Sequence, residues 1–291
     1  MQSSYIGRFA PSPTGSLHIG SLLTAVASWC DARAVNGQWL LRIEDVDTTR
    51  TQTGAADHII RTLDHYGLGW DGEIVYQSQR TEYYQAALDT LQQQGIIFWC
   101  TCSRSELAKS QSAIYSGTCR LHCHYRAHAA ARVRVNEQVI MFDDGVFGHT
   151  HENLAESVGD FVVFRRDGLF AYQLAVVVDD AAQGVTDIVR GADLLDNTAR
   201  QIYLQQRLSL STPRYTHIPL VVNGMGEKLS KQTGAAALTT HNLSKNLWQV
   251  LSQLGQQPPN ALQSENCQTI LAWAIRHWQR HHIPQRLMLV G

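Results

Sequence analysis

A histidine near the start of the chain lies where a phosphate could bind. The segment PSPTGSLHIG contains three turn formers, Pro11, Pro13 and Gly15, directly after a short apolar run. Gly20 allows the backbone of the following helical pattern to approach a ligand closely, and such a helix start attracts anions. His18, placed at that start, can donate a hydrogen bond to a phosphate whose charge grows during a reaction. An ordinary turn with a surface histidine has the same composition, so this segment alone leaves both interpretations open.

A pair of lysines, Lys228 and Lys231, lies much later in the chain within the segment EKLSKQ. Small residues follow this segment, which favours a mobile loop. Two lysines three positions apart in such a loop can neutralise the charge of a pyrophosphate leaving group. KLSK is also a common surface sequence, so the pair does not establish a reaction by itself.

The cysteines are clustered rather than spread over the chain. Six cysteines in 291 residues are too few for a disulfide scaffold. Four of them fall close together, Cys100, Cys102, Cys119 and Cys123. Clustered thiolates in an intracellular protein favour Zn²⁺, and His122 and His124 offer further ligands beside them. Cys30 and Cys267 lie in apolar helical patterns and are expected in the core.

The elements that must position these residues follow the order strand, helix, strand. Residues 5–10 form a short apolar strand candidate, a helical pattern runs over 17–35, and Asn36-Gly37 ends it before the buried-strand candidate 39–43. This order is the unit of a parallel sheet. Further helical patterns cover 55–66, 81–94, 192–208, 244–254 and 267–281, and regular structure is also expected over 160–164 and 170–178. The cysteine-rich segment interrupts the pattern and is predicted to be an insertion.

The two candidate phosphate-binding segments together resemble the paired HIGH and KMSKS signatures of the class I aminoacyl-tRNA synthetases. They read HIGS at 18–21 and KLSKQ at 228–232 in this chain. The glutamyl branch of this family is resembled by the segments RFAPSPTGSLHIGSLLTA and LLRIEDVDTTR. Further matches to the same branch are YQLAVVVDD and VRGADLL. The resemblance covers about residues 4–237. It implies an α/β fold with a Rossmann-like parallel sheet and an ATP-dependent ligase, with Mg²⁺ accompanying the ATP.

The resemblance also implies roles for individual residues. Arg8 and Arg190 are expected to bind the carboxylates of glutamate, with Glu44 holding the ammonium group, Tyr172 lining the pocket and Ser12 contacting the substrate. ATP is expected to contact the residues of the two signatures, which are His18, Gly20, Ser21, Lys228, Ser230 and Lys231. Two positions depart from the family pattern: Ser21 replaces a histidine, and KLSKQ replaces KMSKR or KMSKS. Both variants keep His18, Gly20 and the two lysines, so the chemistry is expected to survive.

The chain stops about 55 residues after KLSKQ, where a full glutamyl enzyme continues with an anticodon-binding domain. In this it resembles the stand-alone paralogues that activate glutamate without tRNA and attach it to the queuosine base in the anticodon of tRNA(Asp). In those paralogues zinc is held by a Cys-x-Cys pair and a Tyr-x-x-x-Cys pair, which implies Cys100, Cys102, Tyr115 and Cys119 as ligands here. Two alternatives stay open, a catalytic-only synthetase that charges a tRNA 3' end and a non-catalytic RNA-binding relative.

The expected organisation has two halves of a catalytic domain, 1–94 and 136–237, around a zinc-binding insertion at 95–135, with a helical subdomain at 238–291. The net charge of −1 gives no global attraction to nucleic acid. Local clusters of arginine are candidates for contacts with RNA phosphates, namely Arg104, Arg120, Arg126, Arg132, Arg276 and Arg280. No segment has the length and apolar character of a signal or a membrane span. The sequence therefore predicts a cytoplasmic, monomeric enzyme.

Overall fold

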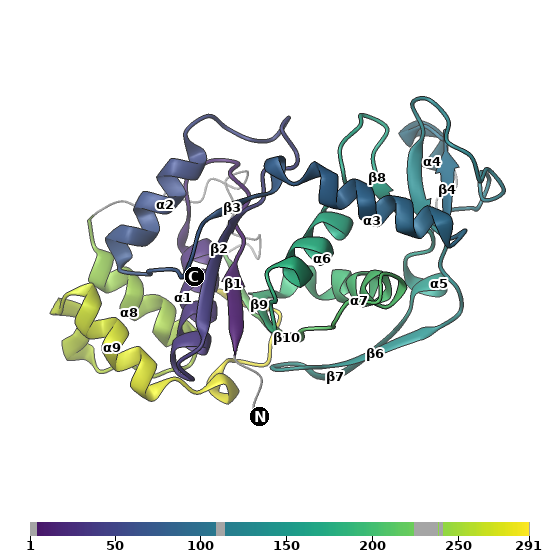
Figure 1. Cartoon of the computed structure of the whole chain (residues 1–291). Coiled ribbons are helices and arrows are strands. Elements are labelled where there is room, and N and C mark those ends of the chain that lie inside the picture. The colour runs from purple at the N-terminus through teal and green to yellow at the C-terminus, as the bar shows by residue number, and fades with distance from the viewer. Residues whose placement is uncertain (1–4, 109–113, 224–237, 239–240, 291) are drawn as a thin grey trace.

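The computed structural model describes residues 5–108, 114–223, 238 and 241–290. In that part of the chain, none of the helices combines the length and apolar character needed to cross a bilayer. Figure 1 shows the helices and strands grouped around two regions, one at each side of a central set of parallel strands. Each region has its own buried apolar cluster.

The first region begins with the predicted strand, helix and strand. β1 (Ile6–Phe9) and β2 (Gln38–Ile43) pair in parallel, and α1 (Ile19–Arg33) connects them. β3 (Val75–Tyr76) extends this sheet after α2 (Ala55–Tyr66), whose bounds are those predicted. α1 is apolar on nearly all sides and most of its residues are buried, because the sheet covers one side of it and later helices cover the other.

Parallel strands from the second half of the chain lie beside β1. β9 (Asp187–Gly191) and β10 (Arg214–Ile218) pair in parallel, and β9 contacts β1. The Thr186 N–H donates to the Ile6 carbonyl at 2.9 Å, which joins the two sets of strands. The prediction of a Rossmann-like parallel sheet is therefore confirmed. The predicted helix 192–208 begins with 3-10 turns (Ala192–Asn197) and is α-helical only over α7 (Thr198–Arg207).

The second region contains an antiparallel sheet that the sequence patterns do not show. β4 (Ile97–Cys100) pairs with β5 (Ala130–Val133), and β5 pairs with β8 (Phe161–Phe164). A hairpin of β6 (Val139–Asp144) and β7 (Gly148–Asn153) precedes β8. The remaining helices of this region are α3 (Thr81–Gln93), α4 (Arg104–Ala108), α5 (Leu154–Ser157) and α6 (Tyr172–Ala182). The segment 95–135 thus shares a sheet with residues 161–164.

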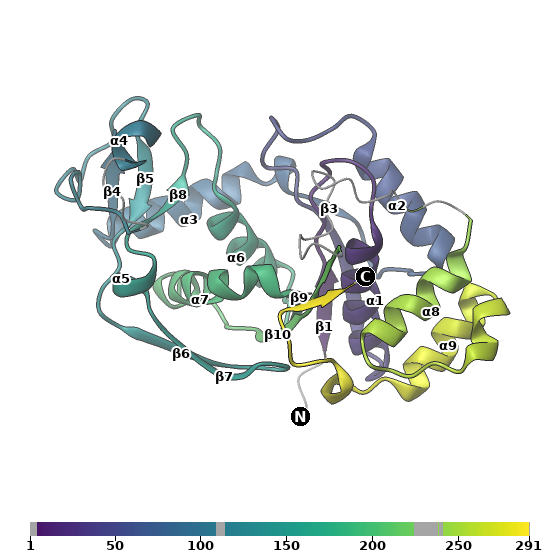
Figure 2. The ribbon, with the colours of Figure 1, turned by 180° about the vertical axis from the view of Figure 1, so that it is seen from behind.

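Helices close to the carboxyl end of the chain pack against α1. α8 (Leu243–Gln253) and α9 (Cys267–His277) both contact it, and Figure 2 shows them together on one side of the molecule. The prediction that the last helix reaches residue 281 was wrong, because Trp278 has extended backbone angles and its indole N–H donates to buried Asp31 at 2.9 Å. Arg280 also pairs with Asp31, at 2.6 Å. Those two contacts hold the chain against α1, and after the break only a separate 3-10 turn (Arg280–His282) follows.

The last described strand belongs to a separate two-stranded sheet. β12 (Met288–Val290) pairs in parallel with β11 (Leu220–Val222), with Leu220 opposite Met288. β11 directly follows β10 and leads into the segment that contains Lys228 and Lys231. Those two lysines and Ser230 lie outside the described residues.

Candidate active site

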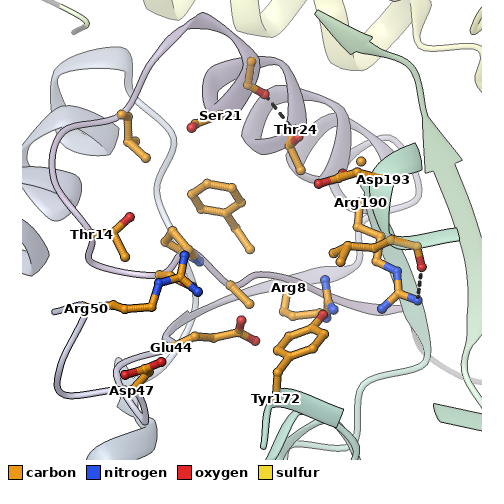
Figure 3. Close-up of a pocket in the computed structure, with 18 of the residues that line it drawn as sticks. Arg8, Thr14, Ser21, Thr24, Glu44, Asp47, Arg50, Tyr172, Arg190 and Asp193 are labelled. Atoms are coloured by element: carbon orange, nitrogen blue, oxygen red, sulfur yellow. Dashed lines mark hydrogen bonds between the residues drawn. The ribbon is translucent and has the colours of Figure 1, made fainter. Parts of the chain in front are cut away.

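A pocket of about 790 Å³ opens at the carboxyl ends of β1, β2 and β9. In open parallel sheets the carboxyl ends of the strands are the usual place for a ligand, since loops and helix starts converge there. Eight residues singled out in the sequence line this pocket, namely Arg8, Ser12, His18, Gly20, Ser21, Glu44, Tyr172 and Arg190. Figure 3 shows Arg8, Glu44, Tyr172 and Arg190 around one part of the space, with Ser21 and Thr24 across it.

The loop between β1 and α1 forms one wall of the pocket. Gly15 has a φ of 130°, a conformation that favours glycine, so the predicted turn depends on this residue. Backbone bonds tie the loop to the segment after β2, since the Glu44 N–H donates to the Pro11 carbonyl at 3.0 Å. The first turn of α1 has no acidic residue, which leaves the positive end of its dipole to an anion.

His18 is the N-cap of α1. Its Nδ1 accepts a hydrogen bond from the Ser21 N–H at 3.3 Å, and this cap fixes the orientation of the ring. A neutral imidazole whose Nδ1 accepts carries its proton on Nε2. His18 can therefore offer an Nε2–H donor in the pocket, which is the chemistry that a phosphate with growing negative charge needs.

On the opposite side, Arg8 and Glu44 line the pocket, and Arg42 and Asp180 lie buried behind them. Asp180 accepts from Arg8 Nε at 3.2 Å and from Arg42 at 2.8 Å. Burial opposes ionisation of Asp180, but the two arginines hold its pKa below the usual range. Glu44 lies 3.5 Å from Arg42, and burial raises its pKa to about 7 even though Arg42 and Arg8 act in the opposite direction. An ammonium group bound at Glu44 would stabilise its ionised form.

Arg190 lies on β9, and among the described residues its four hydrogen-bond acceptors include no carboxylate. Its Nε donates to His217 Nε2 at 2.9 Å, and its terminal nitrogens donate to Gln201 Oε1 at 2.6 Å, Thr198 Oγ1 at 2.8 Å and the Leu194 carbonyl at 3.2 Å. Arg8, in contrast, pairs directly with Asp180. Arg190 is thus the pocket arginine whose charge is better able to bind a carboxylate of a ligand.

Several pocket residues were not singled out in the sequence. They include the polar residues Thr14, Thr24, Asp47, Arg50, Arg165 and Asp193. Asp47 and Arg50 belong to the LLRIEDVDTTR segment, so their place in a family motif was the available signal. Arg165 pairs with Asp47 at 2.6 Å, a contact between segments 118 positions apart that no local pattern reveals.

The clustered cysteines meet at the end of β4. The sulfurs of Cys100, Cys102 and Cys119 lie within 4.8 Å of one another, with 3.6 Å between Cys102 and Cys119. The Tyr115 hydroxyl completes the group, at 3.4 Å from the Cys100 sulfur and 3.7 Å from that of Cys102. Zinc bonded to sulfur at about 2.3 Å in a tetrahedron separates two ligand sulfurs by about 3.8 Å. The donor set therefore fits a closed zinc site of three thiolates and one phenolate.

The alternative ligand Cys123 lies apart from this group. It is exposed, and its sulfur contacts the Leu121 carbonyl and Arg134, each at 3.4 Å. The geometry thus favours Tyr115 over Cys123 as the fourth ligand.

The surroundings of Cys119 favour its thiolate form. Burial opposes ionisation of the thiol, but hydrogen bonds from Thr101, Tyr115 and Cys102 lower its pKa to about 6.

We expect the purified protein to contain close to one zinc ion per chain. Cys119→Ser should lower both the zinc content and the melting temperature, because a structural zinc contributes directly to the free energy of folding. Cys123→Ser is the matched control and should leave both quantities unchanged. Metal analysis combined with thermal unfolding measures both, and a metal-free protein of equal stability would rule out the site.

Three arginines predicted as phosphate contacts have partners within the protein. Arg120 pairs with Asp160 at 3.1 Å, Arg132 donates to the Asp160 carbonyl at 2.8 Å, and Arg280 pairs with Asp31. Arg126 is exposed. Arg276 Nε donates to the Ala272 carbonyl at 3.2 Å within its own helix. The side chain of Arg104 lies outside the described residues. A role of any of the six in RNA binding stays a prediction.

The fold and the pocket define the catalytic core of a class I tRNA synthetase. The family model "tRNA synthetases class I (E and Q), catalytic domain" matches residues 6–251. Over 285 residues the chain is 53% identical to the glutamyl-Q tRNA(Asp) synthetase of Pseudomonas entomophila, and 50% identical to that of Pseudomonas aeruginosa. These alignments cover 98% of this chain and 96% and 97% of those proteins. The chain therefore belongs to the family of glutamyl-Q tRNA(Asp) synthetases.

Solved structures support the fold independently. The glutamate-tRNA synthetase of Elizabethkingia anophelis superposes with a TM-score of 0.83 at 20% identity, over 99% of this chain and 68% of that one. A glutamate tRNA ligase from Elizabethkingia meningosepticum, solved in complex with its amino acid, gives a TM-score of 0.82 at 21% identity, over 98% and 67% of the two chains. At this identity the similarity establishes the fold.

Proposed function

We propose that this protein uses ATP to activate L-glutamate as its adenylate without tRNA, and then transfers glutamate to the queuosine base in the anticodon of tRNA(Asp). The observation that carries the proposal is one pocket that joins a phosphate-binding helix start to a buried set of arginine and carboxylate groups. The relatives that match over nearly their full length carry the name of this activity.

Activation is an attack of the glutamate α-carboxylate on the α-phosphate of ATP, with pyrophosphate as leaving group. The Nε2–H of His18 and the start of α1 stabilise the charge that develops on the phosphate. Lys228 and Lys231 are proposed to neutralise the pyrophosphate, and Gly20, Ser21 and Ser230 to contact the nucleotide. In the second step a hydroxyl of the acceptor displaces AMP. Positioning and electrostatics suffice for both steps, so no nucleophilic side chain is needed.

Glutamate is held at the other end of the pocket. Arg190 and Arg8 bind its side-chain carboxylate, and this leaves the α-carboxylate free to attack. Glu44 holds the ammonium group, while Tyr172 and Ser12 complete the wall. Zinc at Cys100, Cys102, Tyr115 and Cys119 would hold the end of β4 and the following loop together. Its role would be structural, because four protein donors leave no open position for a substrate.

The proposal extends to the organisation of the protein. Residues 1–94 and 136–237 would form the two parts of the catalytic domain, 95–135 the zinc-binding insertion and 238–291 a helical subdomain. Mg²⁺ would accompany the ATP phosphates, and the enzyme would act as a monomer in the cytoplasm.

Exchange of pyrophosphate into ATP tests the first step. We expect exchange that depends on glutamate and proceeds without tRNA. Glutamine should be about 10- to 100-fold less effective in kcat/KM, because its neutral amide loses charge-assisted bonds to the arginines. Arg190→Gln should reduce the ratio of kcat/KM for glutamate to kcat/KM for glutamine. Equal exchange with the two amino acids would refute the assignment of the carboxylate partners, and no exchange with glutamate would refute the proposed activation.

A further inference from the structure

Arg190 is held from behind by a buried pair of residues from other segments of the chain. His217 lies on β10 directly opposite Arg190 in the parallel register, and its Nε2 accepts from Arg190 Nε at 2.9 Å. On its other side, His217 Nδ1 lies 2.6 Å from Asp144 Oδ2 at the end of β6. The side chains of His217 and Asp144 are both fully buried.

The hydrogen bonds determine which nitrogen of His217 carries the proton. A guanidinium is always a donor, so His217 Nε2 must accept from Arg190 and the ring proton must lie on Nδ1. That Nδ1–H donates to the Asp144 carboxylate. A second proton on Nε2 would face the N–H of Arg190, so the ring stays neutral. Burial and Arg190 lower the pKa of His217 and outweigh the opposing effect of Asp144.

Asp144 is built as a fixed acceptor rather than as a partner for a substrate. The backbone N–H groups of Val146 and Phe147 each donate to its Oδ1 at 3.0 Å, and the His217 N–H donates to its Oδ2 at 3.0 Å. Burial opposes ionisation, but the interaction with the His217 ring, followed by the bonds from the Phe147 and Val146 N–H groups, holds the pKa of Asp144 below its usual range. The negative charge therefore lies one imidazole ring away from Arg190 and does not neutralise it directly.

The remaining donors of Arg190 show what this arrangement achieves. Four of its five N–H groups donate to described residues. The fifth, on a terminal nitrogen, is not used in these bonds, and Arg190 lines the pocket in which a ligand would accept from it. The Thr198 hydroxyl lies 3.2 Å from His217 Nε2 and also accepts from Arg190. The guanidinium plane is thus fixed before a ligand arrives, which reduces the entropy lost on binding.

We propose that Asp144 and His217 are positioning residues that orient Arg190 for the carboxylate of glutamate and keep its charge available. This inference rests on the proposed function, because it takes glutamate as the ligand of Arg190. Neither residue lines the pocket, and each acts only through Arg190. Their effect should therefore appear in the binding of glutamate and not in the binding of ATP.

The test compares three variants in pyrophosphate exchange. His217→Leu keeps the volume but removes the acceptor, and we expect the KM for glutamate to rise about 10- to 100-fold while the KM for ATP stays within about twofold. His217→Gln can place its amide oxygen near the position of Nε2 and should restore the KM for glutamate to within about fivefold of the wild type. Asp144→Asn removes the charge that fixes the tautomer and should give an intermediate KM.

Thr216→Val is the matched control, since Thr216 is buried on the same strand but alternates to the other face. It should leave the KM for glutamate unchanged even if it lowers the melting temperature. Equal rises in the KM for glutamate and ATP in His217→Leu, or no rescue by His217→Gln, would overturn the positioning role. Failure of the wild type to exchange with glutamate would instead refute the proposed function.

Discussion

Labelled glutamate is expected on tRNA(Asp) that contains queuosine and not on the same tRNA with unmodified guanosine. The acceptor in the proposed reaction is a hydroxyl of the cyclopentene ring, which guanosine lacks, so the expected effect is loss of all transfer. Contacts to the phosphates of the anticodon stem would position either RNA equally well, because they carry no information about the base. Selectivity must then come from the fit of the modified base in the pocket.

The position of the label separates the proposed reaction from charging of a 3' end. Nuclease digestion and identification of the labelled nucleotide should give queuosine. Periodate is a poor discriminator, since it oxidises the cyclopentene diol as well as the terminal ribose. Label recovered on the terminal adenosine, or equal labelling of the two RNAs, would move the assignment to an ordinary synthetase.

Replacement of His18 should reduce activation of glutamate strongly. Loss of one preorganised donor to a developing charge costs about 100- to 1000-fold in rate. His18→Ala removes both the Nε2 donor and the cap of α1, and the lost cap should lower stability by about 1 kcal/mol. Steady-state pyrophosphate exchange and thermal unfolding measure the two effects.

His18→Asn separates catalysis from capping. Its side-chain oxygen can still accept from the Ser21 N–H, since asparagine is a good N-cap, but it cannot reach as far as the imidazole Nε2. This variant should therefore keep the melting temperature of the wild type and lose as much exchange activity as His18→Ala. Exchange at the rate of the wild type in His18→Asn would show that the ring serves only to cap the helix.

Local patterns predicted the elements that position the side of the pocket proposed to bind phosphate. The turn at 11–15, the helix after it and the strand 39–43 depend on residues close together in sequence, and α2 has the predicted bounds. The class I resemblance supplied Arg8, Glu44, Tyr172 and Arg190, and all of them line the same pocket. Their proposed contacts with substrates stay predictions.

The features of the fold and of the site that the sequence did not predict depend on contacts between distant segments. Strand β5 (130–133) lies between 97–100 and 161–164, but the sequence of these four residues does not indicate which strands are its neighbours. The environment of Arg190 is set by His217 and Asp144, which belong to other strands, and the end of α9 is set by Asp31 on α1. In each case a partner far along the chain decides the outcome, and single-sequence patterns do not contain that information.

The pairing of β11 with β12 has a consequence for synthesis of the protein. Leu220 and Val221 line the pocket, but their strand partner is made only after α8 and α9. Because chains fold from the amino end as they leave the ribosome, this wall of the pocket lacks its strand partner until the chain has been made past α9. The helices α8 and α9, which cover one side of α1, and the strand that pairs with β11 are made in close succession, so the core of the first region and this wall of the pocket should become complete together during synthesis.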